Sequence, residues 1–150
     1  MNYKEHILGG IISYAGLLYL LKFLNYPLTT MHTIQWFLFC ILGALFPDID
    51  TKSKIQIWLY RLLFLIYLLI FIINPTSQIL IFVSILAIIP LIVHHRGIFH
   101  NIWFIASLSV ASVIIIHFSS PHLPINEISM AALFFMFGAL SHLLLDRKIV

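Results

Sequence analysis

Histidine and aspartate residues gather at four places in a 150-residue chain that otherwise contains few charged side chains. Neutral imidazole and carboxylate groups together suit Zn²⁺, Mn²⁺ or Fe²⁺. The candidate metal ligands are His6, Asp48, Asp50, His95, His100, His142 and Asp146. They outnumber the roughly three protein ligands of one catalytic zinc, so the sequence predicts two divalent ions, with zinc preferred and manganese or iron as alternatives.

The spacing within two of these groups favours a shared ion. His142 and Asp146 are four residues apart, so on a helix both side chains project from one face about one turn apart. Asp48 and Asp50 follow a proline that ends a helix. Residues two apart in an extended turn point the same way, so both carboxylates could bind metal, or one could bridge two ions.

The third group is a loop with two histidines and an arginine. Gly97 allows a tight turn that would bring His95 and His100 to a common centre. Arg96 in the same loop is placed to hold an anionic group with two hydrogen bonds. Paired metal ions activate a bound water and polarise a phosphoryl or acyl oxygen, which is the chemistry of hydrolysis. We therefore name Arg96 and Asp50 as the candidate catalytic residues.

Composition indicates that these groups must work in a membrane. The chain is 62% hydrophobic and 9% charged, with a mean hydropathy of +1.09, whereas soluble domains are roughly 45–50% apolar and 25% charged. The single cysteine, Cys40, excludes an internal disulfide. The net charge of +3 comes without a basic face, so we expect membrane lipid and no nucleic acid as a partner. The sequence makes no prediction of oligomeric state.

Six apolar segments bounded by turn residues predict an all-α, polytopic helical bundle that forms one domain over residues 1–150. Only the third reaches the roughly 20 residues that a span needs, and the second is short. Trp36, Trp58 and Trp103 fall near segment ends, as an aromatic belt at the membrane interface would place them. The segments are Ile7–Leu24, Thr33–Phe46, Ile55–Ile73, Gln78–Val93, Ile102–Phe118 and Ile128–Leu145.

The basic residues predict the orientation of the bundle. With six crossings and both termini in the cytoplasm, Lys22 is the only basic residue that falls on the outer side. All four His/Asp groups then lie at the cytoplasmic ends of the segments, which is what a metal site between helices requires. Ligands at the ends of spans lie at the depth of lipid head groups, so we expect a lipid or another membrane-associated substrate. The cytoplasmic basic residues are Lys4, Lys52, Lys54, Arg61, Arg96, Arg147 and Lys148.

The order of these motifs resembles the membrane-bound metal-dependent hydrolase family of YdjM-like bacterial inner-membrane proteins. The resemblance extends from His6 to Asp146, nearly the whole chain. It implies a multi-pass protein of the inner membrane that uses its histidines and aspartates as metal ligands for hydrolysis. The motifs that carry it are His6, residues 45–50 (LFPDID) with Ser53, residues 95–100 (HRGIFH) and residues 138–146 (GALSHLLLD).

Two features depart from the family pattern. The histidine loop has Phe99 and Asn101 where a threonine and a serine are usual, which removes two hydroxyl groups that would orient ligands or substrate. The sequence also stops four residues after Asp146, without the extension that many members place there. We therefore expect any substrate contact made by that extension to be missing.

The same residues would also suit roles without catalysis. Asp48 and Asp50 fit a turn that pairs with nearby lysines, and His142 with Asp146 fits an ion pair at a helix end. A transporter or metal sensor would bind ions without chemistry, but such proteins usually place ionisable residues at the membrane midplane and often contain inverted repeats. A purely structural membrane protein is the third alternative. Clustering at one face favours the enzyme.

Overall fold

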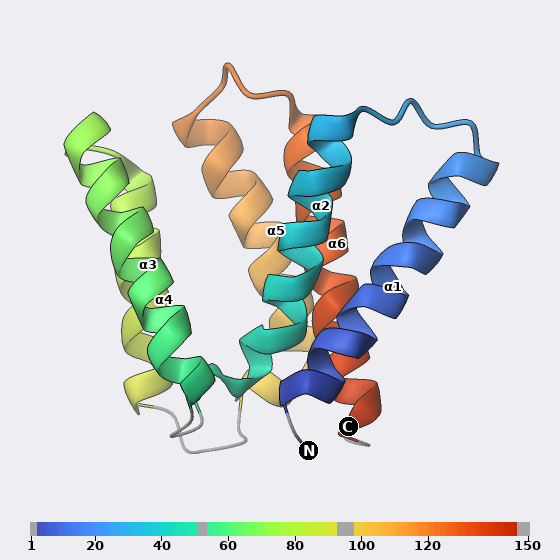
Figure 1. Cartoon of the computed structure of the whole chain (residues 1–150). Helices are drawn as coiled ribbons and strands as arrows, with labels where there is room; N and C mark the ends of the chain where they lie inside the picture. The colour runs from blue at the N-terminus through green and yellow to red at the C-terminus, as the bar shows by residue number, and fades with distance from the viewer. Residues whose placement is uncertain (1–2, 51–53, 93–97, 147–150) are drawn as a thin grey trace.

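The computed structural model describes residues 3–50, 54–92 and 98–146, and these residues fold as helices joined by short connections (Figure 1). No strand occurs among them, which confirms the predicted all-α bundle. The predicted segments correspond to six α-helices, and two short 3₁₀ helices lie between them. The elements are α1 (Tyr3–Phe23), α2 (Thr30–Leu45), η1 (Phe46–Asp50), α3 (Lys54–Ile73), α4 (Gln78–Ile92), η2 (Ile98–His100), α5 (Ile102–Ser119) and α6 (Ile125–Leu145).

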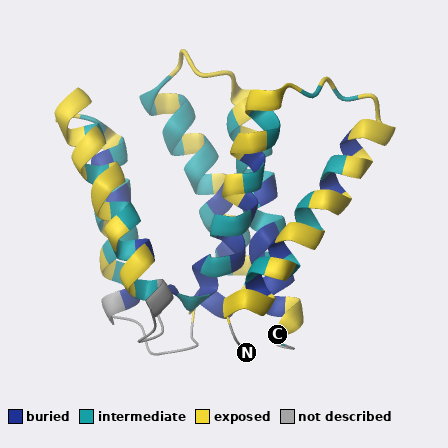
Figure 2. Cartoon of the chain, in the orientation of Figure 1, coloured by how far each residue is buried: buried dark blue, intermediate teal, exposed yellow. Residues whose placement is uncertain are grey.

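Five of these helices are long and apolar enough to cross a membrane, and α4 is the shorter one. The second span is longer than predicted, because α2 and η1 together give an apolar stretch of 20 residues, Thr30–Ile49. It begins early because the Thr29 side chain accepts a hydrogen bond from the His32 N–H and caps the helix. Exposed residues lie along the outer faces of the bundle (Figure 2), and many of them are large and apolar, as expected of helices in lipid.

The centre of the bundle is the crossing of α2 and α6, where two glycines allow the backbones to meet. A Cβ atom on Gly43 would lie 2.0 Å from the Phe135 carbonyl oxygen, and one on Gly138 would lie 2.0 Å from the Cys40 carbonyl oxygen. No side chain fits at either position. Small residues at helix contacts are typical of membrane proteins, where close packing replaces the hydrophobic effect.

Helix α1 contacts this pair near its N-terminal end and diverges from α2 toward its C-terminal end (Figure 1). At the contact, the Cys40 thiol donates a hydrogen bond to the Gly10 carbonyl at 3.3 Å. One turn before Cys40 in α2, Trp36 is 2% exposed and stacks on Phe134 at a centroid distance of 5.1 Å. The predicted place of Trp36 in an interfacial belt is therefore wrong, because the ring faces the helix crossing.

A second apolar cluster holds the two 3₁₀ helices against the bundle. Phe46 and Ile49 of η1 pack with Leu59 of α3 and Phe99 of η2. The start of α1 and the end of α6 lie at the same end of the bundle as these 3₁₀ helices (Figure 1). We call this end, with the start of α1, η1, η2 and the end of α6, the site end.

Candidate metal centre

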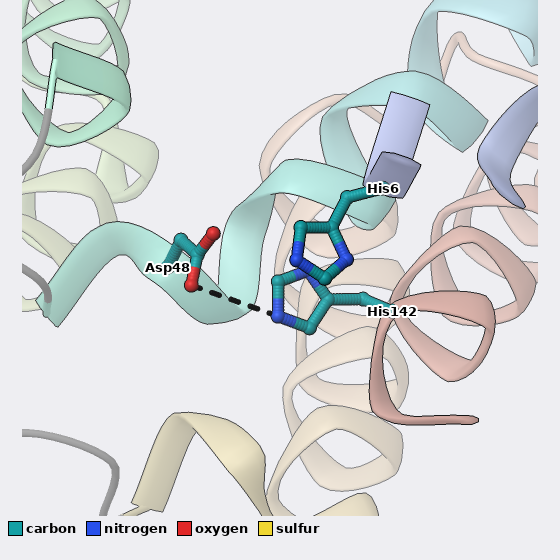
Figure 3. Close-up of side chains that lie close together, drawn as sticks. All are labelled: His6, Asp48 and His142. Atoms are coloured by element: carbon teal, nitrogen blue, oxygen red, sulfur yellow. Dashed lines mark ion pairs between the residues drawn. The ribbon is translucent and has the colours of Figure 1, made fainter. Parts of the chain in front are cut away.

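Five of the seven predicted ligands come together at the site end, from four elements far apart in the sequence. Helix α1 supplies the first histidine, η1 one aspartate and η2 another histidine, while α6 supplies a histidine in its last turn and an aspartate at its C-cap. Three of them are drawn in Figure 3. The five residues are His6, Asp48, His100, His142 and Asp146.

His142 is the centre of the cluster, and its position follows from the helix crossing. It lies one turn after Gly138, so the close approach of α6 to α2 brings its ring against the α2 backbone. Its Nδ1 lies 2.7 Å from the Ala44 carbonyl oxygen. A carbonyl only accepts hydrogen bonds, so Nδ1 carries the proton and Nε2 keeps a free lone pair. A backbone carbonyl that fixes the tautomer in this way is common behind metal-binding histidines.

The lone pair of His142 faces two carboxylates. Nε2 lies 3.6 Å from Oδ1 of Asp48, the pair dashed in Figure 3, and 3.6 Å from Oδ2 of Asp146. The side chain is 0% exposed, and Nε2 has no hydrogen-bond partner among the described residues. A buried ring nitrogen without a partner costs free energy, so this atom is poised for a ligand.

His6 covers one face of the His142 ring. The two imidazoles stack with centroids 3.7 Å apart and an angle of 16° between their planes (Figure 3). His6 Nε2 lies 3.6 Å from Oδ1 of Asp146, and its Nδ1 is buried without a hydrogen-bond partner among the described residues. The start of α1 is thus fixed to the end of α6 by the site itself.

His100 completes the cluster from η2. Its Nε2 lies 3.9 Å from Oδ2 of Asp146, and its ring stands edge-on to His142 at 5.5 Å. The neighbouring Phe99 is fully buried and packs edge-on against Phe46. Asn101 caps α5, because its side chain accepts a hydrogen bond from the Trp103 N–H at 2.8 Å.

The separations in the cluster fit ligands of a shared ion. The nitrogen–oxygen distances of 3.6–3.9 Å exceed those of hydrogen bonds. Ligands about 2.0–2.2 Å from a tetrahedral zinc lie about 3.3–3.6 Å from one another, so three of the four separations reach that range and the His100–Asp146 separation of 3.9 Å is slightly longer. Two groups have one ligand atom of each residue within 4.8 Å of the others: His6, Asp48 and His142, and His100, His142 and Asp146. Both groups contain His142. Its Nδ1 is hydrogen-bonded to the Ala44 carbonyl, so Nε2 is the one His142 atom that could bind metal in either group.

The remaining predicted site residues are not placed. His95 and Arg96 lie outside the described residues, and so does the side chain of Asp50, although its backbone ends η1. Ser141, next to His142, donates its hydroxyl to the Gly138 carbonyl at 2.7 Å, within its own helix. Sequence reasoning missed the Ala44 carbonyl, because a backbone acceptor leaves no trace in residue type.

Fold and site together define a class: a multi-pass helical membrane protein with a histidine–aspartate cluster at one end of its bundle. The chain belongs to the YdjM inner membrane protein family, whose family model matches residues 1–147. It is thus a multi-pass protein of the inner membrane, as predicted. Neither the curated proteins nor the solved structures gave a significant match.

Proposed function

We propose that this protein is a metal-dependent hydrolase of the inner membrane that cleaves an ester or phosphoester of a lipid or another membrane-associated substrate. The observation that carries the proposal is the Nε2 atom of His142, which is buried, has no hydrogen-bond partner among the described residues, and faces the carboxylates of Asp48 and Asp146. Nitrogen and oxygen donors without thiolate suit a catalytic divalent ion, with zinc preferred and manganese or iron as alternatives.

The residues of the cluster have separable roles in this proposal. His142 would bind through Nε2, because Ala44 holds its Nδ1, and His6 and His100 would add imidazole ligands. Asp48 and Asp146 would balance the charge of the ion, and a carboxylate oxygen not engaged in binding would accept the proton of the attacking water. A divalent ion at this place would supply an activated water and a Lewis acid for the scissile bond.

The shared His142 bears on the number of ions. One ring nitrogen binds one ion, so we propose that the described residues hold a single ion. The second ion of the two-metal hypothesis would need Asp50 and His95 as further ligands. Arg96 would then hold the anionic group of the substrate, as proposed from its position in the loop between the two histidines.

The place of the cluster supports an enzyme over a transporter. The ligands lie at the start of α1, in η1 and η2, and at the end of α6. In a membrane, this end of the bundle would lie where lipid head groups meet the hydrocarbon core. An ion pathway would place such residues at the midplane. There, the α2–α6 crossing contains Cys40, Gly43 and Gly138, tightly packed and without charge.

The experiment that tests this function is a hydrolysis screen with the full chain in lipid nanodiscs, using phospholipids and isoprenoid phosphates. We expect turnover that stops on chelation, returns with zinc, and is lost in Asp48→Asn while His32→Gln, at the opposite end of the bundle, keeps it. Metal bound by the wild type without hydrolysis of any substrate in the panel would favour the transporter or sensor. Hydrolysis unaffected by chelator and by Asp48→Asn would overturn the proposal.

A further inference from the structure

An apolar cavity of about 540 Å³ lies between the α3–α4 pair and the helices α2, α5 and α6. Figure 1 shows this pair set apart from α2 and α6. The cavity extends from Gln35 and Glu127 near the start of α2 and α6 to Phe46 and Ile49 in η1. Its size is within the roughly 300–1,000 Å³ typical of small-ligand sites.

We propose that this cavity binds the hydrocarbon chain of a membrane lipid, with the polar end of that lipid at the metal centre. The second half of this statement rests on the proposed function and names its substrate class. Along α2 the cavity follows the helix from Gln35 to Phe46, about 17 Å at 1.5 Å per residue. Half of the hydrocarbon core of a bilayer is about 15 Å, the depth that one lipid chain fills.

The cavity wall has little to offer a polar ligand. Ser109 and Ser112 line it, but each hydroxyl donates to a carbonyl of its own helix, at 2.9 Å to Ile105 and 2.7 Å to Leu108. Apart from these and a few polar groups near the Glu127 end, the lining side chains are hydrocarbon or aromatic. Such a surface does not hold ordered water, and in a bilayer the available apolar ligand is lipid.

The inner end of the cavity lies beside the 3₁₀ helix that supplies Asp48 to the metal centre. Phe46 and Ile49 line the cavity and lie on either side of Asp48 in the same 3₁₀ helix. Phe46 also packs on Phe99, the residue before His100. A lipid chain that ends at η1 would therefore bring its first polar group close to two candidate ligands.

The length of the cavity argues against a membrane-spanning helix as the occupant. Such a helix of about 18 residues is about 27 Å long and about 10 Å wide. The cavity follows α2 for only about 17 Å. A helix from a second copy of the chain would need the α3–α4 pair to move away, whereas one lipid chain needs no rearrangement.

Photo-crosslinking tests this directly. The full chain would be placed in nanodiscs of phosphatidylethanolamine and phosphatidylglycerol that carry a diazirine in mid-chain, and the labelled residues mapped by mass spectrometry. We expect labelling of cavity residues such as Leu63 and Leu86. Ser112→Phe fills the cavity and should lower that labelling at least about fivefold. The matched control is Ser107→Phe, because Ser107 is exposed on the same helix and outside the cavity.

A second cavity-filling variant, Ala132→Leu on α6, keeps the test valid where Ser112→Phe fails to fold. Labelling spread evenly over outer residues such as Ile72 and Ile114, and unchanged by both fillings, would overturn the proposal. Crosslinks between two copies of the chain at the cavity would also overturn it.

Metal content measured on the same samples separates this inference from the proposed function. We expect Ser112→Phe to keep its metal, and Asp48→Asn to lose metal but keep the cavity labelling. Labelling that Ser112→Phe blocks, in a wild type that binds no metal, would sustain the chain-binding site and overturn the hydrolase. Bound metal without specific labelling of the cavity would overturn the chain-binding site and leave the metal centre standing.

Discussion

Each end of the bundle carries a histidine beside a carboxylate, but the two pairs lie in different surroundings. At the end opposite the site, His32 Nε2 lies 3.3 Å from Oε1 of Glu127, and the side chains are 26% and 46% exposed. At the site end, His142 is fully buried and faces Asp48 and Asp146 at longer distances of 3.6 Å. The exposed pair is an ordinary surface ion pair. What sets the site end apart is the burial of His142 and the convergence of two carboxylates on its ring, and not the distance.

The comparison teaches that packing, and not residue type, distinguishes the two ends. His32 is partly exposed and stacks on the indole of Trp36 at 5.6 Å. His142 has a carbonyl, two other imidazoles and two carboxylates around one ring. Only the second arrangement leaves a buried nitrogen that lacks a hydrogen-bond partner among the described residues.

The largest expected effect comes from the glycine that seats His142. Gly138→Ala puts a methyl group 2.0 Å from the Cys40 carbonyl oxygen, so α2 and α6 must separate. We expect a loss of roughly 3 kcal/mol or more in the free energy of unfolding, together with loss of metal binding. Thermal denaturation in detergent, with metal analysis, measures both.

The matched control is Gly16→Ala on α1, where a Cβ would meet nothing within 4 Å. It should leave stability unchanged or raise it by up to about 1 kcal/mol, because alanine is the better helix former. Equal losses in the two variants would show that close packing at the α2–α6 crossing is not what matters.

The next effect is the loss of the central ligand. His142→Gln removes the imidazole shared by both ligand groups, and we expect zinc affinity to fall by more than about 100-fold. Mutating a residue that only hydrogen-bonds to a metal ligand already lowers metal affinity about 10–100-fold. His32→Gln makes the same chemical change at the opposite end and should leave affinity as it was. Competition with a fluorescent chelator measures both constants, and similar losses in the two variants would break the comparison.

A smaller effect is expected from replacing one carboxylate by its amide. Asp48→Asn keeps the size of the side chain but removes the charge that faces His142, and we expect roughly 10–100-fold weaker zinc binding. Glu127→Gln is the equivalent change at the other end. Calorimetric titration with zinc measures the affinity of both variants, and we expect Glu127→Gln to bind as the wild type does. Unchanged binding in Asp48→Asn would exclude that aspartate as a ligand.

The smallest effect belongs to the exposed pair itself. Glu127→Gln should change the free energy of unfolding by less than about 1 kcal/mol, because exposed ion pairs are screened by water and salt. Melting curves at low and high salt test this. A large loss that persists in high salt would mean that the His32–Glu127 pair holds α2 and α6 together as firmly as the site does.

The fold was largely predictable because apolar runs and turn residues determine the helices of a membrane protein. The second span was underestimated, since neither the cap at Thr29 nor the continuation into η1 is visible as hydrophobicity. Trp36 was misplaced for a related reason: an aromatic residue near a helix end suits both the interface and a helix crossing.

The site was predictable as a set of residues, but not as a geometry. Spacing placed His142 and Asp146 on one helix face, and the structure brings His6, Asp48 and His100 to them. The sharing of His142 between two ligand groups was not predictable, because it depends on the Ala44 carbonyl and on the α2–α6 distance set by Gly43 and Gly138.

The most direct test of the central claim is X-ray absorption at the zinc edge, combined with metal analysis, on the full chain purified without chelators. The account predicts at least one equivalent of zinc, with nitrogen or oxygen neighbours at about 2.0–2.2 Å and imidazole scattering that weakens in His142→Gln. Less than a tenth of an equivalent, or bound zinc whose spectrum is the same in His142→Gln, would contradict it.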